Sequence, residues 1–165
     1  MTSPVLVAYA TKAGSTREVA EVVARTLREH GLEADVRPAG EVGTLAPYAG
    51  VVLGAAIYMG RVHKDARRFL RSHRAELADR PLAVFGMGPQ SLDDDDVAAS
   101  RAQLDHALAS FPELRLATVA IFGGVVDPGK LRFPFNRMPA TDARDWTAIR
   151  SWADAVANAV TPIAA

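Results

Sequence analysis

Five short apolar runs punctuate the chain, each about as long as a β-strand. Three of them carry apolar side chains almost continuously instead of at alternate positions. This pattern is typical of parallel strands that are covered on both faces. The runs are residues 5–10, 34–37, 51–56, 82–85 and 117–122.

Helical periodicity separates these runs. Apolar side chains recur at spacings of three and four in four stretches, which predicts amphipathic helices. The stretches are residues 19–30, 66–77, 97–111 and 146–160. Gly31 marks the expected end of the first helix, whereas residues 39–50 read as a loop with at most one helical turn.

The alternation of strands and helices predicts an α/β fold. We expect a doubly wound five-stranded parallel sheet with helices on both faces, because parallel strands need right-handed crossover connections. The 165 residues contain no repeat, linker or low-complexity tract, so a single domain over residues 1–165 is expected. Ligands of such sheets bind beyond the carboxyl ends of the strands. The segments at those ends are residues 10–16, 55–61, 86–93 and 123–128.

The first of these segments reads "TKAGSTRE" over residues 11–18. Gly14 allows close backbone approach, and the hydroxyls of Thr11, Ser15 and Thr16 flank it at the expected start of a helix. Together with the amides of residues 12–16 they would form a cradle for a phosphate group. The alternative is a capping box, in which Ser15 caps the helix and Glu18 reaches back.

Other phosphate-binding loops do not fit these residues. A nucleotide P-loop places its lysine directly after a glycine, whereas Lys12 precedes Gly14. A dinucleotide fingerprint needs three glycines, and this turn has one. A phosphoacceptor receiver domain needs acidic residues after the first and third strands, where the sequence has "AYA" and "GAA". A monophosphate remains as the expected ligand.

The third strand leads into a second candidate segment. Gly54, Ala55 and Ala56 are small enough for a flat ring to approach the backbone, and Tyr58 follows them. An aromatic stack there would contribute about 1 kcal/mol beyond burial. A lone tyrosine is usually a half-exposed loop residue, but the nearby phosphate cradle favours a ring contact.

Three stretches together resemble the flavodoxin-domain family that includes bacterial menaquinone-dependent protoporphyrinogen dehydrogenases. They are "ATKAGSTREVA", "VVLGAAIYMGRVHKDARRFL" and "RDWTAIRSWADAVA". The resemblance implies a flavodoxin-like fold with strand order 2-1-3-4-5 and bound FMN. The segment after the fifth strand is shorter here than the long basic and aromatic insertion of those dehydrogenases.

The same resemblance implies which residues hold the cofactor. The FMN phosphate would bind to Thr11, Lys12, Ala13, Gly14, Ser15 and Thr16. The flavin ring would be bordered by Ala56, Ile57, Tyr58, Met59 and Gly60. Backbone amides near the pyrimidine edge would come from Gly86, Met87, Gly88 and Pro89.

The histidines and one acidic run are further candidates. His63 matches a family histidine and is either a proton donor near the ring or a helix-start residue facing solvent. His30 and His73 lie on helical apolar stripes, which predicts partly buried structural roles. The run from Asp93 to Asp96 is expected to be a solvated loop that caps a helix beginning near Val97, so no metal site is predicted.

Residues 126–140 contain the aromatic and cationic side chains Arg132, Phe133, Phe135 and Arg137. This segment is either a lid over an apolar, anionic substrate or an interface in a homodimer. The sequence does not separate these two interpretations.

Composition narrows the classes of function. Nineteen basic residues balance nineteen acidic ones, so no overall field favours nucleic acid or an anionic membrane. The absence of cysteine excludes disulfides and thiolate nucleophiles. The start shows no signal peptide, and no stretch approaches the roughly 20 apolar residues of a membrane span. We therefore expect a soluble cytoplasmic protein.

Three functions follow, in decreasing order of support. The first is an FMN-dependent oxidoreductase that acts on a quinone or another planar apolar substrate, with the redox chemistry belonging to the flavin. The second is an electron-transfer carrier with a redox partner, against which the formal net charge of zero argues mildly. The third is a flavin-free module of the same fold.

Overall fold

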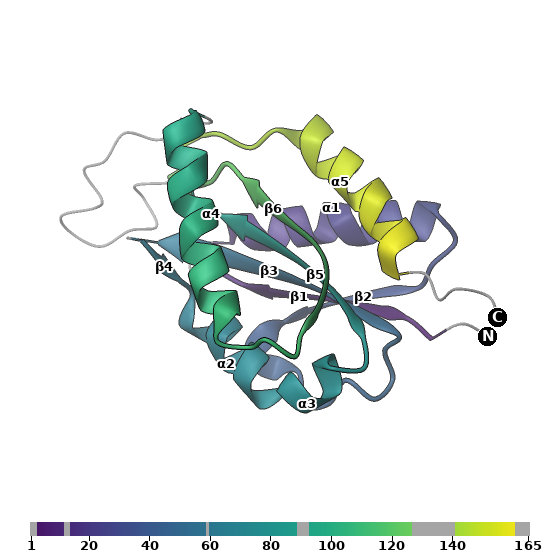
Figure 1. Ribbon diagram of the computed structural model, residues 1–165. Helices are drawn as coiled ribbons and strands as arrows, with labels where there is room; N and C mark the ends of the chain where they lie inside the picture. Colours follow the sequence, from purple (N-terminus) through teal and green to yellow (C-terminus); the bar gives the residue numbers. More distant parts are fainter. Residues whose placement is uncertain (1–2, 12–13, 59, 89–92, 127–140, 161–165) are drawn as a thin grey trace.

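The central sheet has the predicted doubly wound topology. The computed structural model describes residues 3–11, 14–58, 60–88, 93–126 and 141–160. Within these residues, five parallel strands pair in the order β2-β1-β3-β5-β6 (Figure 1), which is 2-1-3-4-5 when only the parallel strands are counted. The strands are β1 (Val5–Ala10), β2 (Ala34–Pro38), β3 (Gly50–Tyr58), β5 (Pro81–Met87) and β6 (Arg115–Phe122). The fold class and the strand order are confirmed.

Three short strands were not predicted. β4 (Arg61–Val62) turns back antiparallel on the end of β3, and β7 (Val125–Val126) pairs with β8 (Thr141–Asp142) in a separate two-stranded sheet. A pair of residues is too short to show a hydrophobic period, so the sequence carries no signal for them.

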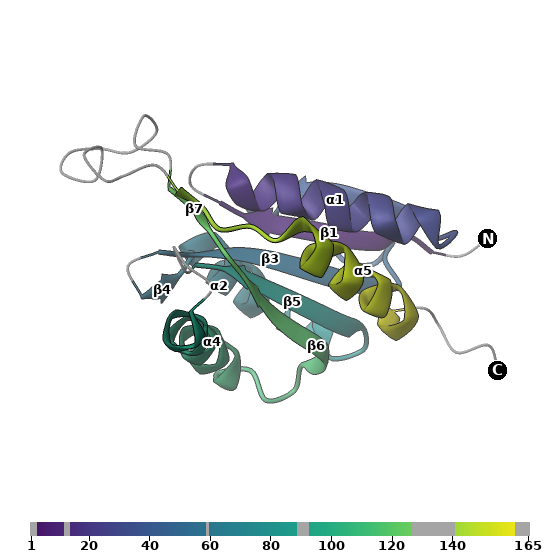
Figure 2. The same cartoon turned by 90° about the horizontal axis from the view of Figure 1, so that it is seen from above.

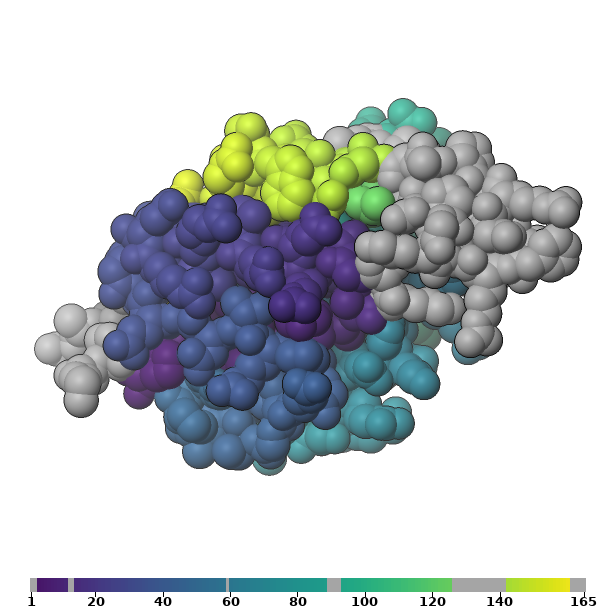
Figure 3. All heavy atoms as spheres, turned by 180° about the vertical axis from the view of Figure 1, so that it is seen from behind, coloured from purple at the N-terminus to yellow at the C-terminus, as the bar shows by residue number. Residues whose placement is uncertain are grey.

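The helices cover both faces of the sheet. α1 (Ser15–Glu29) and α5 (Trp146–Val160) lie side by side on one face (Figures 2 and 3). The other face carries α2 (Lys64–Ser72), α3 (Arg74–Leu77) and α4 (Asp94–Ala109). The predicted helical turn in the loop after β2 is the 3-10 helix η1 (Ala39–Glu41).

Two helix predictions need correction. The stretch 66–77 is not one helix, because the chain leaves helical geometry at His73, which ends α2 and begins α3. The helix expected near Val97 begins at Asp94, so Asp94, Asp95 and Asp96 form its first turn. Carboxylates are favourable there because the helix dipole is positive at its N-terminus.

Each face of the sheet has its own core cluster. All six residues of β1 are buried, which is why its sequence shows an unbroken apolar run. On the α1 and α5 face, Phe85 packs against Phe122 and Trp152, with ring centroids 5.8 and 5.7 Å apart. A side chain at Gly54 would collide with the Phe85 ring. Gly54 therefore makes room for the core.

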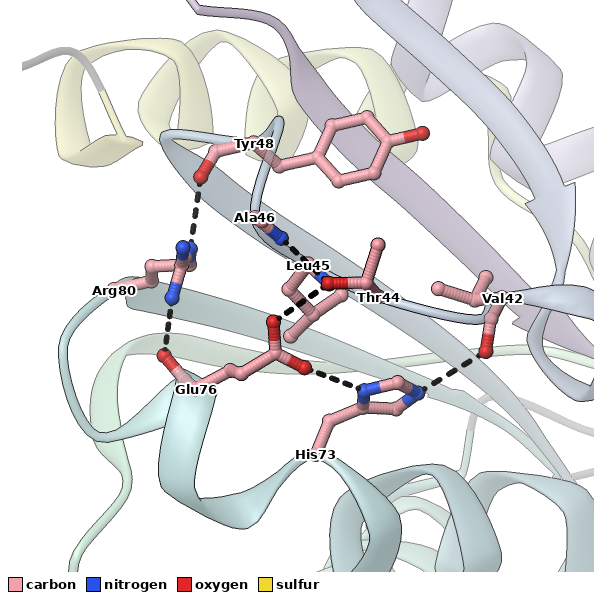
Figure 4. A network of polar contacts seen from close by, with 8 residues as sticks. All are labelled: Val42, Thr44, Leu45, Ala46, Tyr48, His73, Glu76 and Arg80. Atoms are coloured by element: carbon pink, nitrogen blue, oxygen red, sulfur yellow. Dashed lines mark hydrogen bonds and ion pairs between the residues drawn. The ribbon is translucent and has the colours of Figure 1, made fainter.

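The two histidines with predicted structural roles differ in burial. His73 is buried, as predicted, and holds the loop after η1 against α3 (Figure 4). His30 is more exposed than His73: its side chain is 38% exposed, and its Nε2 lies 2.8 Å from Asp154 Oδ1 of α5. His30 is the C-cap of α1, beyond the last buried residue of the apolar face of this helix.

Candidate functional site

The predicted binding segments meet at one edge of the sheet. Ala10 pairs with Ala55, and Ala56 pairs with Met87, so the carboxyl ends of β1, β3 and β5 lie next to one another. β1 lies between β2 and β3, and the strand order therefore reverses at this point. Such a reversal is where doubly wound sheets bind ligands.

A left-handed glycine opens the first crossover. Gly14 is the N-cap of α1 with a φ of 91°, a conformation that glycine adopts without the penalty other residues incur. Its N–H donates to Thr11 Oγ1 at 3.0 Å. Thr11 therefore closes the turn through its oxygen, and its own O–H remains a donor.

The start of α1 leaves hydrogen-bonding capacity unused. The first helical bond runs from the N–H of Glu18 to the Gly14 carbonyl at 3.3 Å, so the three preceding amides have no acceptor within the helix. The Thr16 side chain is fully buried, and within the described residues its Oγ1 has no hydrogen-bond partner. Leaving such a group unsatisfied costs about 1–3 kcal/mol. A phosphate at this point would accept from these donors, so the described residues fit one; Lys12 and Ala13 lie outside them.

The alternative capping box is wrong. Gly14 takes the N-cap position, which makes Ser15 the first helical residue, and no side chain caps α1. Glu18 does not reach back to the helix start, because its Oε2 accepts from Arg144 Nη1 at 2.7 Å. With the cap moved to glycine, Ser15 lacks the geometry that a capping side chain needs.

Arg144 is a residue that the sequence analysis did not single out. Its side chain is only 10% exposed and pairs with Asp142 at 2.8 Å as well as with Glu18. The hydrogen bonding that Arg144 donates to the Asp142 carboxylate is the main reason that the pKa of Arg144 is raised, and it also lowers the pKa of Asp142. The guanidinium also lies 4.8 Å from the Trp146 ring centroid. Arg144 thus joins the segment before α5 to the first turn of α1.

The predicted ring border presents both buried and exposed positions. Ile57 is 9% exposed and belongs to the core on the α4 side, whereas Ala56 is half-buried and Tyr58 is 36% exposed. Gly60 is exposed in the turn between β3 and β4, and Met59 lies outside the described residues. Among the described residues of this stretch, Ala56 and Tyr58 therefore have the accessible side chains.

The loop after β5 is described only to Gly88. Gly86 and Met87 are buried in β5, and the Gly88 N–H donates to the Phe122 carbonyl at 3.3 Å. Pro89 lies outside the described residues. Of the segment 126–140, only Val126 is described, so Arg132, Phe133, Phe135 and Arg137 fall outside as well.

His63 is a helix cap. Its Nδ1 accepts from the Asp65 N–H at 3.1 Å at the start of α2, and its side chain is 17% exposed. The expected position at a helix start is therefore confirmed, although the side chain is mostly covered. The cap occupies the Nδ1 lone pair, so the neutral ring carries its proton on Nε2. The backbone N–H of His63 donates to the Ala56 carbonyl at 2.8 Å, which places it beside the predicted ring border.

The described helices include none with both the length and the apolar character that crossing a membrane requires.

Known proteins match both the sequence and the fold. Protoporphyrinogen IX dehydrogenase [quinone] of Escherichia coli strain K12 is 32% identical over 84 residues, which is 50% of this chain and 46% of that protein. The same figures hold for the protein of this name from Escherichia coli O157:H7. The match thus spans about half the length of these curated relatives.

Solved flavodoxins share the architecture. A single-site variant of flavodoxin from Pseudomonas aeruginosa aligns with a TM-score of 0.61 and 18% identity over 95% of this chain and 98% of that one. A flavodoxin from the domain Archaea gives a TM-score of 0.64 with 11% identity, over 95% of this chain and 98% of that one. At these identities the likeness shows the fold.

A sequence profile of the flavodoxin domain family matches residues 6–138. FMN is the cofactor of this family, in agreement with the cofactor expected from the sequence. The matched range includes β1, the first turn of α1 and the ends of β3 and β5. The chain therefore belongs to the flavodoxin domain family.

Proposed function

We propose that this chain is an FMN-binding oxidoreductase whose substrate is a quinone or another planar apolar compound. The observation that carries the proposal is the open first turn of α1 at the edge where the strand order reverses, with a buried Thr16 hydroxyl that has no partner among the described residues. The partial match to a protein named protoporphyrinogen IX dehydrogenase [quinone] supports the quinone as a reaction partner.

The phosphate of FMN would bind to the donors at the start of α1. Thr11, Ser15 and Thr16 supply hydroxyls, and the first-turn amides supply N–H groups. The helix dipole adds a positive potential there, so this arrangement needs no fixed cation.

The ring of FMN would lie along Ala56 to Gly60, with Tyr58 as the stacking side chain. FMN, when bound, supplies hydride and single-electron transfer. The chain would orient the ring and leave one face open to the substrate. His63 lies beside this border, and its Nδ1 accepts from the Asp65 N–H.

Thr16→Val tests the phosphate cradle, because it removes the unpartnered hydroxyl and preserves the shape of the side chain. FMN affinity should fall about tenfold, the size of one lost hydrogen bond to a charged group. The unliganded variant should be at least as stable as the parent, since an unsatisfied buried group disappears. FMN fluorescence quenching and urea unfolding measure the two quantities.

Thr26→Val is the matched control. Thr26 lies in the same helix and is 4% exposed, but its Oγ1 donates to the Val22 carbonyl at 3.0 Å. This variant should lose stability and keep its FMN affinity. Unchanged FMN affinity in Thr16→Val would contradict the proposed cradle.

Activity needs a separate experiment. FMN-loaded protein should turn over with a quinone and a chemical or nicotinamide reductant, followed by absorbance. Two widely separated one-electron potentials without turnover would favour the electron carrier. Protein that stays colourless after FMN is added would favour the flavin-free module.

A further inference from the structure

A groove lies on the face of the sheet that carries α2 and α4, away from the start of α1. Figures 1 and 2 show these two helices on the opposite side of the sheet from α1. The groove has a volume of about 640 Å³, begins at the turn between β3 and β4 and continues between α2, α3 and α4. Its charged and aromatic lining comprises Arg61, Arg67, Arg71, Arg74, His106 and Phe111.

The lining is strongly cationic. Four arginines and no aspartate or glutamate are among the described residues that line it, although the whole chain has as many acidic as basic residues. Like charges in one groove repel one another unless counter-charges lie beside them, and Glu113 supplies one for Arg74. The distribution of charge therefore points to an anion as the occupant.

The arginines are held in two different ways. Arg67 Nε donates to the Val62 carbonyl at 3.2 Å, and Arg74 Nε donates to Glu113 Oε1 at 2.6 Å. Those bonds fix the two side chains and leave their terminal nitrogens as donors. Arg61 and Arg71 are exposed, and within the described residues their side chains make no hydrogen bond or ion pair. The groove thus combines two guanidinium groups that hydrogen bonds orient with two, those of Arg61 and Arg71, that have no hydrogen-bond partner among the described residues.

The chemistry of this lining favours phosphate groups. A guanidinium presents a planar fork of donors that matches a phosphate in bidentate fashion. The groove volume lies in the range of small-molecule sites, about 300–1,000 Å³. We propose that the groove binds a small molecule carrying at least two phosphate groups, at a site separate from the FMN phosphate cradle.

Pyrophosphate binding measured by calorimetry on the full chain tests this site. We expect one saturable site that weakens as salt rises from 50 to 200 mM, because exposed charges are screened. Arg71→Ala should lose about tenfold in affinity, and Arg71→Lys should recover only part of it, since a lysine cannot bind bidentately.

Arg68→Ala is the matched control, because Arg68 is an exposed arginine of the same helix that does not line the groove. The affinity of Arg68→Ala for pyrophosphate should stay within twofold of that of the parent protein. Equal losses in Arg68→Ala and Arg71→Ala would reveal non-specific attraction and overturn the proposal. So would the absence of saturable binding at millimolar pyrophosphate.

Two further binding experiments distinguish this groove from the phosphate cradle at α1 and identify the class of ligand. Thr16→Val should leave pyrophosphate affinity unchanged, and a loss in that variant alone would place the anion at α1 and overturn the proposal. ADP compared with pyrophosphate distinguishes the source of the phosphates. Tighter binding of ADP would support a nucleotide, and equal binding would support a free polyphosphate in the same groove.

Discussion

The loop after η1 and the turn after β1 both contain polar side chains. They differ in how many of these side chains have hydrogen-bond partners. In the loop after η1, Glu76 accepts from Thr44 Oγ1 at 3.1 Å and from the Leu45 N–H at 2.9 Å, and Arg80 bonds the Tyr48 and Glu76 carbonyls, each at 2.8 Å (Figure 4). At the start of α1, the buried Thr16 hydroxyl has no partner within the described residues.

His73 shows how complete the first network is. Its Nδ1 lies 3.1 Å from Glu76 Oε1 and its Nε2 lies 3.2 Å from the Val42 carbonyl (Figure 4). Both ring nitrogens of this buried side chain thus lie within hydrogen-bond distance of an oxygen. A network whose members satisfy one another stabilises the fold, whereas unused donors at a ligand edge are available for binding. Four predictions test this distinction.

Glu76→Leu should break the satisfied network. It leaves the Leu45 N–H and the buried His73 ring without their acceptor, so the free energy of unfolding should fall by about 3 kcal/mol. Urea unfolding measures the loss, and FMN affinity should not change. Glu113→Ala, which removes the half-buried partner of the 51% exposed Arg74 side chain, is the control and should hardly affect stability. A small effect of Glu76→Leu would show that the network is not stabilising.

Gly14→Asp should damage the open turn. It places a carboxylate at the cradle in a left-handed conformation, so FMN affinity should fall at least about 100-fold, equivalent to ~2.7 kcal/mol. Gly14→Asn is the control, since asparagine tolerates this conformation and carries no charge. The asparagine variant should bind FMN much more tightly than the aspartate variant. Equal affinities would mean that no phosphate binds at this turn.

Acid should weaken the satisfied network. The hydrogen bond with His73 is the main cause that lowers the pKa of Glu76 below its ordinary 4.5. The unfolded chain therefore binds this proton more readily than the folded one, and stability rises with pH in that range. The contribution is fully present above about pH 4.5 and is lost as pH falls through the folded-state pKa. Urea midpoints from pH 6 to 3 should fall more steeply in the parent than in Glu76→Gln.

Arg144→Ala should have the smallest effect. Its partners Glu18 and Asp142 are 57% and 49% exposed, so the loss of stability should be about 1 kcal/mol. FMN affinity should fall by about twofold, because Arg144 positions the first turn of α1 without belonging to the cradle. Arg150→Ala, an exposed site on α5, is the control. Identical thermal melts for the two variants would contradict an anchoring role for Arg144.

Most of the fold was predictable because the positions that a helix or strand buries recur at regular intervals, and the sequence is apolar at those positions. A strand covered on both faces, such as β1, must be apolar at every position, and a helix such as α5 must be apolar at every third or fourth. The same logic placed the ends of β1, β3 and β5 at one edge. It failed at α1, where the residue types of a capping box are present but the backbone of Gly14 takes the cap.

The sequence by itself determined the α/β class and the edge at which a ligand would bind, because these depend on periodicity and connection rules that act along the chain. The strand order was implied by the resemblance of three stretches to the flavodoxin-domain family. Only the tertiary structure decided which polar groups are satisfied. Glu18 meets Arg144 across 126 positions, and Thr44 meets Glu76 across 32. Likewise, the arginines of α2 and α3 form a groove only because α4 packs beside them. Hydrogen bonds and charge interactions act through space, so a local sequence pattern does not predict which residues distant in the sequence will form them.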